Sequence, residues 1–172
     1  MAWPNLDPIL KPINWAVIGG VATRLYMPER STDDFDIAVN VADALSVRQR
    51  LADNGYAYKG ELSIGGSAWQ DKTGLDIDVI EGYEQWWPEA LAQAQNNRDQ
   101  QGLPIIPLPY LVLLKLKAGR LVDFGDLGKV LGIADEQMLN QVRSVIAKYS
   151  PNDREDLESL IYLGKLEVDN AS

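Results

Sequence analysis

The chain has 172 residues, 46% hydrophobic and 24% charged, which is ordinary for a globular protein of one domain, or of one domain with a small appendage. It contains no cysteine and no histidine, which excludes disulfides, thiolate metal sites and catalysis by Ser-His-Asp or Cys-His groups, so any metal must be held by oxygen. The net charge of −9 argues against general binding to DNA or RNA, because Lys and Arg supply most of the affinity for phosphate backbones.

The N-terminal segment, MAWPNLDPILKPINW, lacks the basic start of a signal peptide and contains three prolines. No apolar run in the sequence approaches the ~18 residues that a membrane-spanning helix needs. We therefore expect a cytoplasmic protein without a membrane partner and without stable binding to DNA.

The first predicted elements form a compact strand–turn–helix–strand unit. The apolar run at 15–18 indicates a buried strand that ends in a tight turn at Gly19 and Gly20. Residues 21–27 are expected to form a short helix, which the following proline ends. Residues 35–39 alternate in character and indicate a second strand.

The middle of the chain predicts a helix followed by antiparallel strands. Residues 42–54 have the pattern of an amphipathic helix. Its apolar face is expected to comprise Leu45, Val47 and Leu51. Residues 56–80 favour antiparallel strands, with a hairpin turn at 71–74.

The last third of the chain is predicted to be mainly helical. A helix at 87–95 and an edge strand at 103–107 come first. Further helices are then expected at about 110–119, 123–131, 135–149 and 151–163, with a frayed end. These elements predict an α+β fold: a mixed β-sheet with flanking helices over 1–108, then a small C-terminal helical region over 109–172, either packed on the core or part of one domain.

Alternating acidic residues on two predicted strands indicate a metal site. Asp34 and Asp36 share one face of their strand, about 6–7 Å apart, because successive side chains point to opposite faces. Asp76 and Asp78 repeat this pattern on a later strand. If the two strands are neighbours, the carboxylates converge and repel one another, by about 4 kcal/mol for a pair 4 Å apart at an effective dielectric constant of 20, so that a cation is favoured there. Oxygen ligands on rigid strands suit Mg²⁺ or Mn²⁺, which can assist a phosphoryl transfer.

The glycine pair adds a candidate phosphate site. A strand that ends in Gly19-Gly20 and runs into a helix leaves backbone N–H groups at the N-terminus of that helix, where phosphate groups bind readily. A lone Gly-Gly is usually only a turn, and a lone Asp-x-Asp is usually a solvated face. The combination of both within one short unit is what favours a nucleotide site.

This combination resembles the signature of the DNA polymerase beta-like nucleotidyltransferase superfamily, and most closely its AbiEii-type abortive-infection branch. The resemblance covers about residues 14–132. It is carried by Gly19-Gly20-Val21-Ala22, Arg30-Ser31-Thr32, Asp34-Phe35-Asp36-Ile37, Ile77-Asp78-Val79-Ile80, the stretch LVLLKLKAGR at 111–120, and Asp123 to Leu127 (DFGDL).

The resemblance implies a metal-dependent nucleotidyltransferase that moves an NMP from an NTP to a hydroxyl group. The acceptor would be an RNA end, a protein or a small molecule, and the branch also implies a toxin with an antitoxin protein as partner. Two other interpretations stay open: an inactive nucleotide-binding or regulatory module of the same fold, and a structural interaction domain.

The resemblance also implies residue roles. The catalytic and Mg²⁺- or Mn²⁺-binding residues would be Asp34, Asp36 and Asp78, with Asp76 as the alternative third acid. The nucleotide-binding residues would be Gly19, Gly20, Arg30, Thr32 and Lys115. Three of these residues have a local alternative. Arg30 could pair with Asp33, Thr32 could shape the turn, and Lys115 could extend to solvent.

Overall fold

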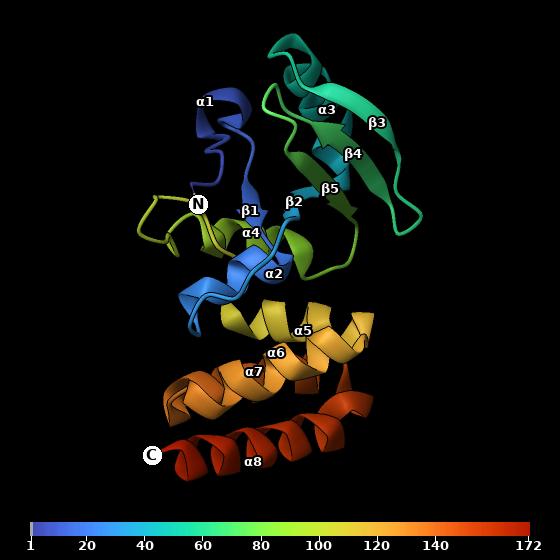
Figure 1. Cartoon of the computed structure of the whole chain (residues 1–172). Coiled ribbons are helices and arrows are strands. Elements are labelled where there is room, and N and C mark those ends of the chain that lie inside the picture. The colour runs from blue at the N-terminus through green and yellow to red at the C-terminus, as the bar shows by residue number, and fades with distance from the viewer. Residues whose placement is uncertain (1) are drawn as a thin grey trace. The chain divides into compact units, whose positions relative to one another are not determined.

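The computed structural model describes residues 2–172, and its internal contacts divide the chain into two units (Figure 1). The sheet unit is the chain up to Ala22 together with Arg30–Ile106. The helical unit is Thr23–Glu29 together with Pro107–Ser172. The segment Thr23–Glu29, which directly follows the short helix Gly19–Ala22, therefore belongs to the helical unit although it lies early in the sequence.

The sheet unit is built on a five-stranded mixed sheet. Its strand order is β1-β2-β5-β4-β3. Only β2 and β5 are parallel neighbours, and the other neighbouring pairs are antiparallel. The strands are β1 (Trp15–Val17), β2 (Phe35–Asn40), β3 (Ala57–Glu61), β4 (Gly66–Gln70) and β5 (Asp76–Gly82).

The turn between β4 and β5 follows from its residues. Asp71 Oδ1 accepts hydrogen bonds from the backbone N–H groups of Thr73 and Leu75, at 2.8 and 2.9 Å. Gly74 adopts a φ of +92°, which side-chain-bearing residues rarely do. The hairpin predicted from the sequence is therefore confirmed, and it fixes the register of β5 next to β4.

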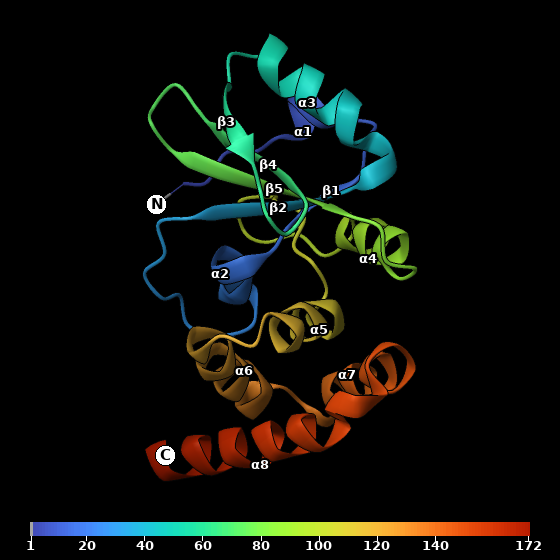
Figure 2. The ribbon, with the colours of Figure 1, turned by 90° about the vertical axis from the view of Figure 1, so that its right-hand side faces the viewer.

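Helices cover both faces of the sheet. α1 (Asp7–Leu10) and α3 (Ala44–Asp53) lie on one side of β2, and α2 (Gly19–Ala22) and α4 (Trp87–Ala94) lie on the other (Figure 2). The alternating residues of β2 that were expected to face the core, Phe35, Ile37 and Val39, are fully buried. The ring of Trp3 stacks on Phe35 with the ring centroids 5.4 Å apart.

Two details differ from the sequence-based expectation. Leu45 is 84% exposed, whereas Ala44, Val47 and Leu51 of α3 are buried. At 100° per residue, positions 45 and 47 point to nearly opposite sides, and 44, 47 and 51 form the real stripe. Residues 103–107 form no strand: only isolated bridges occur there, including one between Val17 and Ile105.

The helical unit contains α5 (Leu108–Ala118), α6 (Leu121–Ile133), α7 (Glu136–Tyr149) and α8 (Arg154–Ala171). α8 continues past the predicted end at 163, so the last turns are helical. The backbones of α6 and α8 approach closely at two glycines: a Cβ atom at Gly164 would lie 2.9 Å from the backbone nitrogen of Gly132. Within the described residues, no helix is both long enough and apolar enough to cross a membrane.

Candidate active site

Acidic residues of two parallel strands lie side by side in the sheet unit. β2 and β5 are adjacent, and Asp36 pairs in register with Asp78. Register partners on parallel strands point to the same face, and neighbouring strands are about 4.8 Å apart. Both side chains are half-buried. The two acid-bearing strands are therefore neighbours, with their carboxylates near the start of β2 and β5.

The negative charge of Asp34 acts on Asp78 as well. Asp34 directly precedes β2 and is exposed. Burial raises the pKa of Asp78, and the negative charges of Asp34 and Asp76 raise it further. Within residues 2–172, no hydrogen bond or ion pair of its side chain compensates the Asp78 carboxylate. Its ionised form is accordingly disfavoured in the folded chain.

The diglycine lies against Asp36. β1 runs antiparallel to β2, and the N–H of Ile18 continues their ladder by donating to the carbonyl of Asp36 at 2.9 Å. Gly19 follows with a φ of +65°. A Cβ atom at this position would collide with Oδ2 of Asp36. Glycine is therefore needed at 19 for its backbone conformation and for the close approach of the carboxylate.

Residues 30–32, which precede β2, lie beside Gly20. A Cβ atom at Gly20 would lie 2.9 Å from Nη2 of Arg30 and 3.0 Å from Oγ1 of Thr32. The Nη1 atom of Arg30 donates to the carbonyl of Ser31 at 3.2 Å. Gly20, Arg30 and Thr32, which the resemblance assigns to nucleotide binding, thus lie together in the sheet unit.

The helix after the diglycine is shorter than the sequence predicted. α2 has four residues and continues as a 3-10 turn over Thr23–Leu25. Such a short helix sums few peptide dipoles, so its N-terminus provides little positive potential. Arg30 places a positive charge beside Gly20.

The structure separates the two candidates for the third acid. Asp76 is exposed and accepts a hydrogen bond from Nε2 of Gln70 at 2.9 Å. Asp78 is half-buried, in register with Asp36, and without such a partner in the described chain. This arrangement favours Asp78 over Asp76 as the acid that faces a ligand together with Asp36.

The donor set fits a hard divalent cation in its chemistry. Asp34, Asp36 and Asp78 offer only oxygen atoms, two of them from adjacent strands, as Mg²⁺ and Mn²⁺ prefer. Among residues 2–172, no three acids already stand close enough together to hold one ion. The carboxylates of Asp34, Asp36 and Asp78 therefore do not surround one point in this structure.

Lys115 has partners inside the helical unit. Its side chain is 4% exposed, and Nζ donates to Asp126 at 2.8 Å and to Asp123 at 3.2 Å. Both carboxylates are buried, and Arg120 also donates to Asp123, at 2.7 Å. One sequence-based alternative had Lys115 extend to solvent, and the burial of its ammonium group shows that this alternative is wrong. Its two partners lie eight and eleven positions further along the chain, on the next helix.

The tryptophan pair belongs to the core of the sheet unit. Trp86 and Trp87 are buried, and Nε1 of Trp87 donates to the carbonyl of Val39 at 2.8 Å. A Cβ atom at Gly82 would collide with the Trp87 ring. The two rings therefore pack in the core and are not exposed for stacking on a base.

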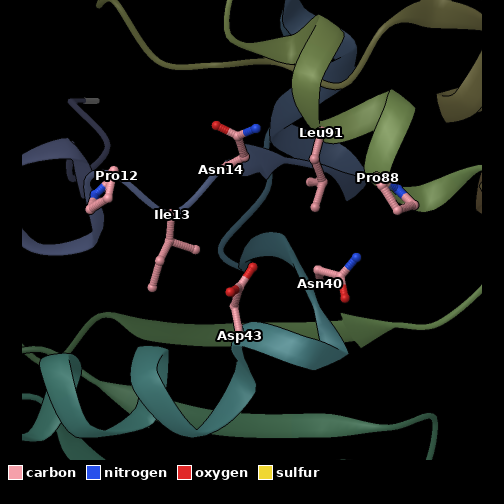
Figure 3. A pocket seen from close by; sticks show the side chains of 7 residues that line it. All are labelled: Pro12, Ile13, Asn14, Asn40, Asp43, Pro88 and Leu91. Carbon is pink, nitrogen blue, oxygen red and sulfur yellow. The ribbon is translucent and has the colours of Figure 1, made fainter.

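A hollow of about 320 Å³ opens at the other end of β2 (Figure 3). Asn40 borders it and lies four residues after Asp36, roughly 13 Å along the strand. Its lining comprises Pro12, Ile13, Asn14, Asn40, Asp43, Pro88 and Leu91. The acidic residues of the candidate site are not part of it.

No protein-family model and no curated protein match the chain. Solved structures do match. The solution structure of antibiotic-resistance factor ANT(2'')-Ia is 13% identical over 96% of this chain and 90% of its own length, with a TM-score of 0.50. The crystal structure of the same factor in complex with adenylyl-2"-tobramycin is 14% identical over 95% and 92%, with a TM-score of 0.49.

A further match is the lincomycin-bound lincosamide antibiotic adenylyltransferase LnuA, which is 18% identical over 44% of this chain, with a TM-score of 0.38. This chain covers 49% of the LnuA chain, about half its length. These neighbours are nucleotidyltransferases. The likeness to the solution structure of ANT(2'')-Ia shows that the chain has the same fold, and it confirms the α+β prediction of a mixed sheet with flanking helices and a helical C-terminal region.

Proposed function

We propose that this chain is a metal-dependent nucleotidyltransferase, which moves an NMP from an NTP to a hydroxyl group and releases pyrophosphate. The observation that supports it best is the pairing of Asp36 with Asp78 on adjacent parallel strands beside the diglycine. The fold shared with ANT(2'')-Ia adds support.

The proposal assigns a role to each group. Mg²⁺ or Mn²⁺, held by Asp34, Asp36 and Asp78, would neutralise the triphosphate and orient the leaving pyrophosphate. Arg30 adds positive charge for a phosphate oxygen, with Thr32 and the diglycine beside it. Lys115 is left out, since two buried carboxylates hold its ammonium group.

Asp78 is the proposed base. Its carboxylate lies half-buried in register with Asp36 and has no hydrogen-bond partner in the described chain, so it can accept a proton from the acceptor hydroxyl. In the proposed step the acceptor hydroxyl gives its proton to Asp78, its oxygen bonds to the α-phosphorus, and the bond to the pyrophosphate oxygen breaks.

The names of the neighbours suggest which acceptors to test first. One neighbour binds adenylyl-2"-tobramycin and another binds lincomycin, both small hydroxyl compounds. We therefore propose a small hydroxyl compound as the acceptor, with an RNA end or a protein side chain as the other two classes.

The AbiEii resemblance extends the proposal to a cytoplasmic toxin that an antitoxin neutralises. Induced expression of such a toxin arrests growth of the host cell. Arrest by the native chain, and normal growth with Asp78→Asn at equal protein level, would support this role. Normal growth with both would exclude the toxin role and leave the proposed reaction untouched.

The reaction is tested with each NTP labelled at the α-phosphate, with Mg²⁺ or Mn²⁺, and with tobramycin, lincomycin, total RNA or a protein extract as acceptor. We expect transfer of label by the native chain and by Asp76→Asn, and a loss of at least about 100-fold in Asp36→Asn and Asp78→Asn. Equal transfer by all four proteins would overturn the assignment.

The inactive nucleotide-binding module predicts a different outcome. NTP and Mn²⁺ would then raise the Tm of the native chain, and no acceptor would receive label. The structural interaction domain predicts neither effect.

A further inference from the structure

The outer face of α8 carries an apolar stripe that nothing in the helical unit covers. Tyr162, Leu163 and Leu166 are 65%, 54% and 40% exposed. On a helix these three positions fall within about 100° of one another. The opposite side of α8 packs inside the unit through Leu157, Ile161 and Gly164. α8 is thus apolar on two opposite sides, only one of which is buried.

Acidic residues border this stripe on both sides. At 100° per residue, Asp169 falls beside Tyr162, whereas Asp156 and Glu167 fall beside Leu163. All three acids are exposed. They form, with Glu155 at the N-terminal end, the acidic rim of the stripe.

Few positive side chains lie near the rim: Arg154 begins α8, and Arg143 of α7 donates to Glu158 of α8 at 2.7 Å and so compensates that acid. Lys165 is the one lysine or arginine between positions 155 and 172 of the sequence. Its Nζ donates to the carbonyl of Ala134 at 2.7 Å, at the end of α6. The rim therefore keeps a net negative charge, and a binding surface with this character favours a positively charged partner.

We propose that the outer face of α8 binds a partner protein through an amphipathic helix whose apolar side chains are flanked by Lys or Arg. Apolar side chains spaced three and four positions apart are the usual contacts when one helix lies on another surface. Two copies of this chain would bring identical acidic rims together, and anionic lipid or nucleic acid would meet the same repulsion. Three apolar contacts make a small interface, so micromolar affinity is expected.

The probe is a fluorescein-labelled synthetic helix of about 18 residues, with Leu every third and fourth position and Lys on both borders. Anisotropy with the full chain should give a micromolar Kd. The double variant Tyr162→Ser, Leu166→Ser should bind roughly 10-fold more weakly or worse. Leu45→Ser removes a leucine from α3 that is even more exposed, at 84%, and this variant should bind like the native chain. Circular dichroism checks that each variant is folded.

Charge is tested separately. The triple variant Asp156→Asn, Glu167→Gln, Asp169→Asn should weaken binding and flatten its salt dependence, and a probe with Glu in place of Lys should not bind. Equal binding of a scrambled Lys peptide would overturn the proposal, because it would show attraction to the net charge alone. An unchanged Kd in the Tyr162/Leu166 double variant would overturn it too. So would a dimer of the native chain, seen by sedimentation, that the double variant dissolves.

Discussion

Both units of this chain bring carboxylates together, but only the helical unit compensates their negative charge with its own cations. In the helical unit Asp123 and Asp126 are buried and receive hydrogen bonds from Lys115. Burial alone would raise the pKa of Asp123, but the bond from Arg120 and the charge of Lys115 outweigh it and lower this pKa. In the sheet unit the pKa of Asp78 is raised by burial, by Asp34 and by Asp76.

The difference separates a structural cluster from a candidate binding cluster. Charges that serve only the fold are compensated by the chain itself, as at Lys115. A half-buried carboxylate such as Asp78, which the described chain does not compensate, costs stability and is typical of groups that meet a ligand. The following predictions test this contrast, from the largest expected effect on stability to the smallest.

Replacing Lys115 by Met should destabilise the fold most. The change removes the ammonium group that donates to both buried carboxylates, while Arg120 still donates to Asp123, and breaking a buried ion pair from one side costs about 3–5 kcal/mol. Urea unfolding followed by circular dichroism measures the free energy of unfolding. The matched control, Lys117→Met on the exposed side of α5, should change it by less than about 0.5 kcal/mol. A stable Lys115→Met chain that has lost nucleotide binding would restore Lys115 to the candidate site.

Gly19→Ala should destabilise the sheet unit by about 1–3 kcal/mol, because a left-handed backbone and a collision with Asp36 act together. Urea unfolding again gives the value. The control is Gly125→Ala on α6, where a Cβ atom would meet no neighbour within 4 Å and where alanine favours the helix. Equal effects at both positions would contradict the close approach of Asp36 to the diglycine.

Asp78→Asn should stabilise the fold while it abolishes transfer. A raised folded-state pKa means that the ionised carboxylate costs stability, a cost absent well below pH 3.8 and fully present above the folded-state pKa. At pH 7 the variant should therefore gain a few degrees in Tm, of the order of 1–3 °C, and the gain should vanish near pH 3. Asp76→Asn serves as the control for activity. A lower Tm at pH 7 would mean that Asp78 is a structural residue.

Acid should weaken the helical unit through Asp123. Because its folded-state pKa is lowered, its contribution is present above pH 3.8 and is lost as the pH falls through the folded-state value. Arg120→Met removes one cause of the lowered pKa, so in this variant the loss should be smaller and should be complete at a higher pH. Unfolding measured between pH 2 and pH 6 checks the shift, and coincident curves for both proteins would contradict it.

The sequence predicted the parts of the site that depend on local patterns. The alternation in β2 and β5 placed Asp36 and Asp78 on solvent-facing sides, and the polar turn at 71–74 indicated the β4–β5 hairpin. The adjacency of β2 and β5 depended on a supposition, because β3 and β4 separate them along the chain.

Features that depend on tertiary packing could not be predicted from the sequence. Nothing local shows that Lys115 would meet Asp123 and Asp126, since the contact spans two helices. The prediction placed Leu45 on the apolar face of α3, whereas Ala44 holds that position and Leu45 is exposed. Residues 103–107 contact β1 only through an isolated bridge and form no strand. The membership of Thr23–Glu29 in the helical unit also depends on contacts far away in the sequence.

The most direct test of the central claim, that the carboxylates of β2 and β5 form the nucleotide-dependent metal site, is Mn²⁺ binding measured by electron paramagnetic resonance in the presence of a non-hydrolysable NTP analogue. We predict that the native chain and Asp76→Asn bind Mn²⁺ when the analogue is present, and that Asp36→Asn and Asp78→Asn lose this binding. Identical Mn²⁺ binding by all four proteins would contradict the account.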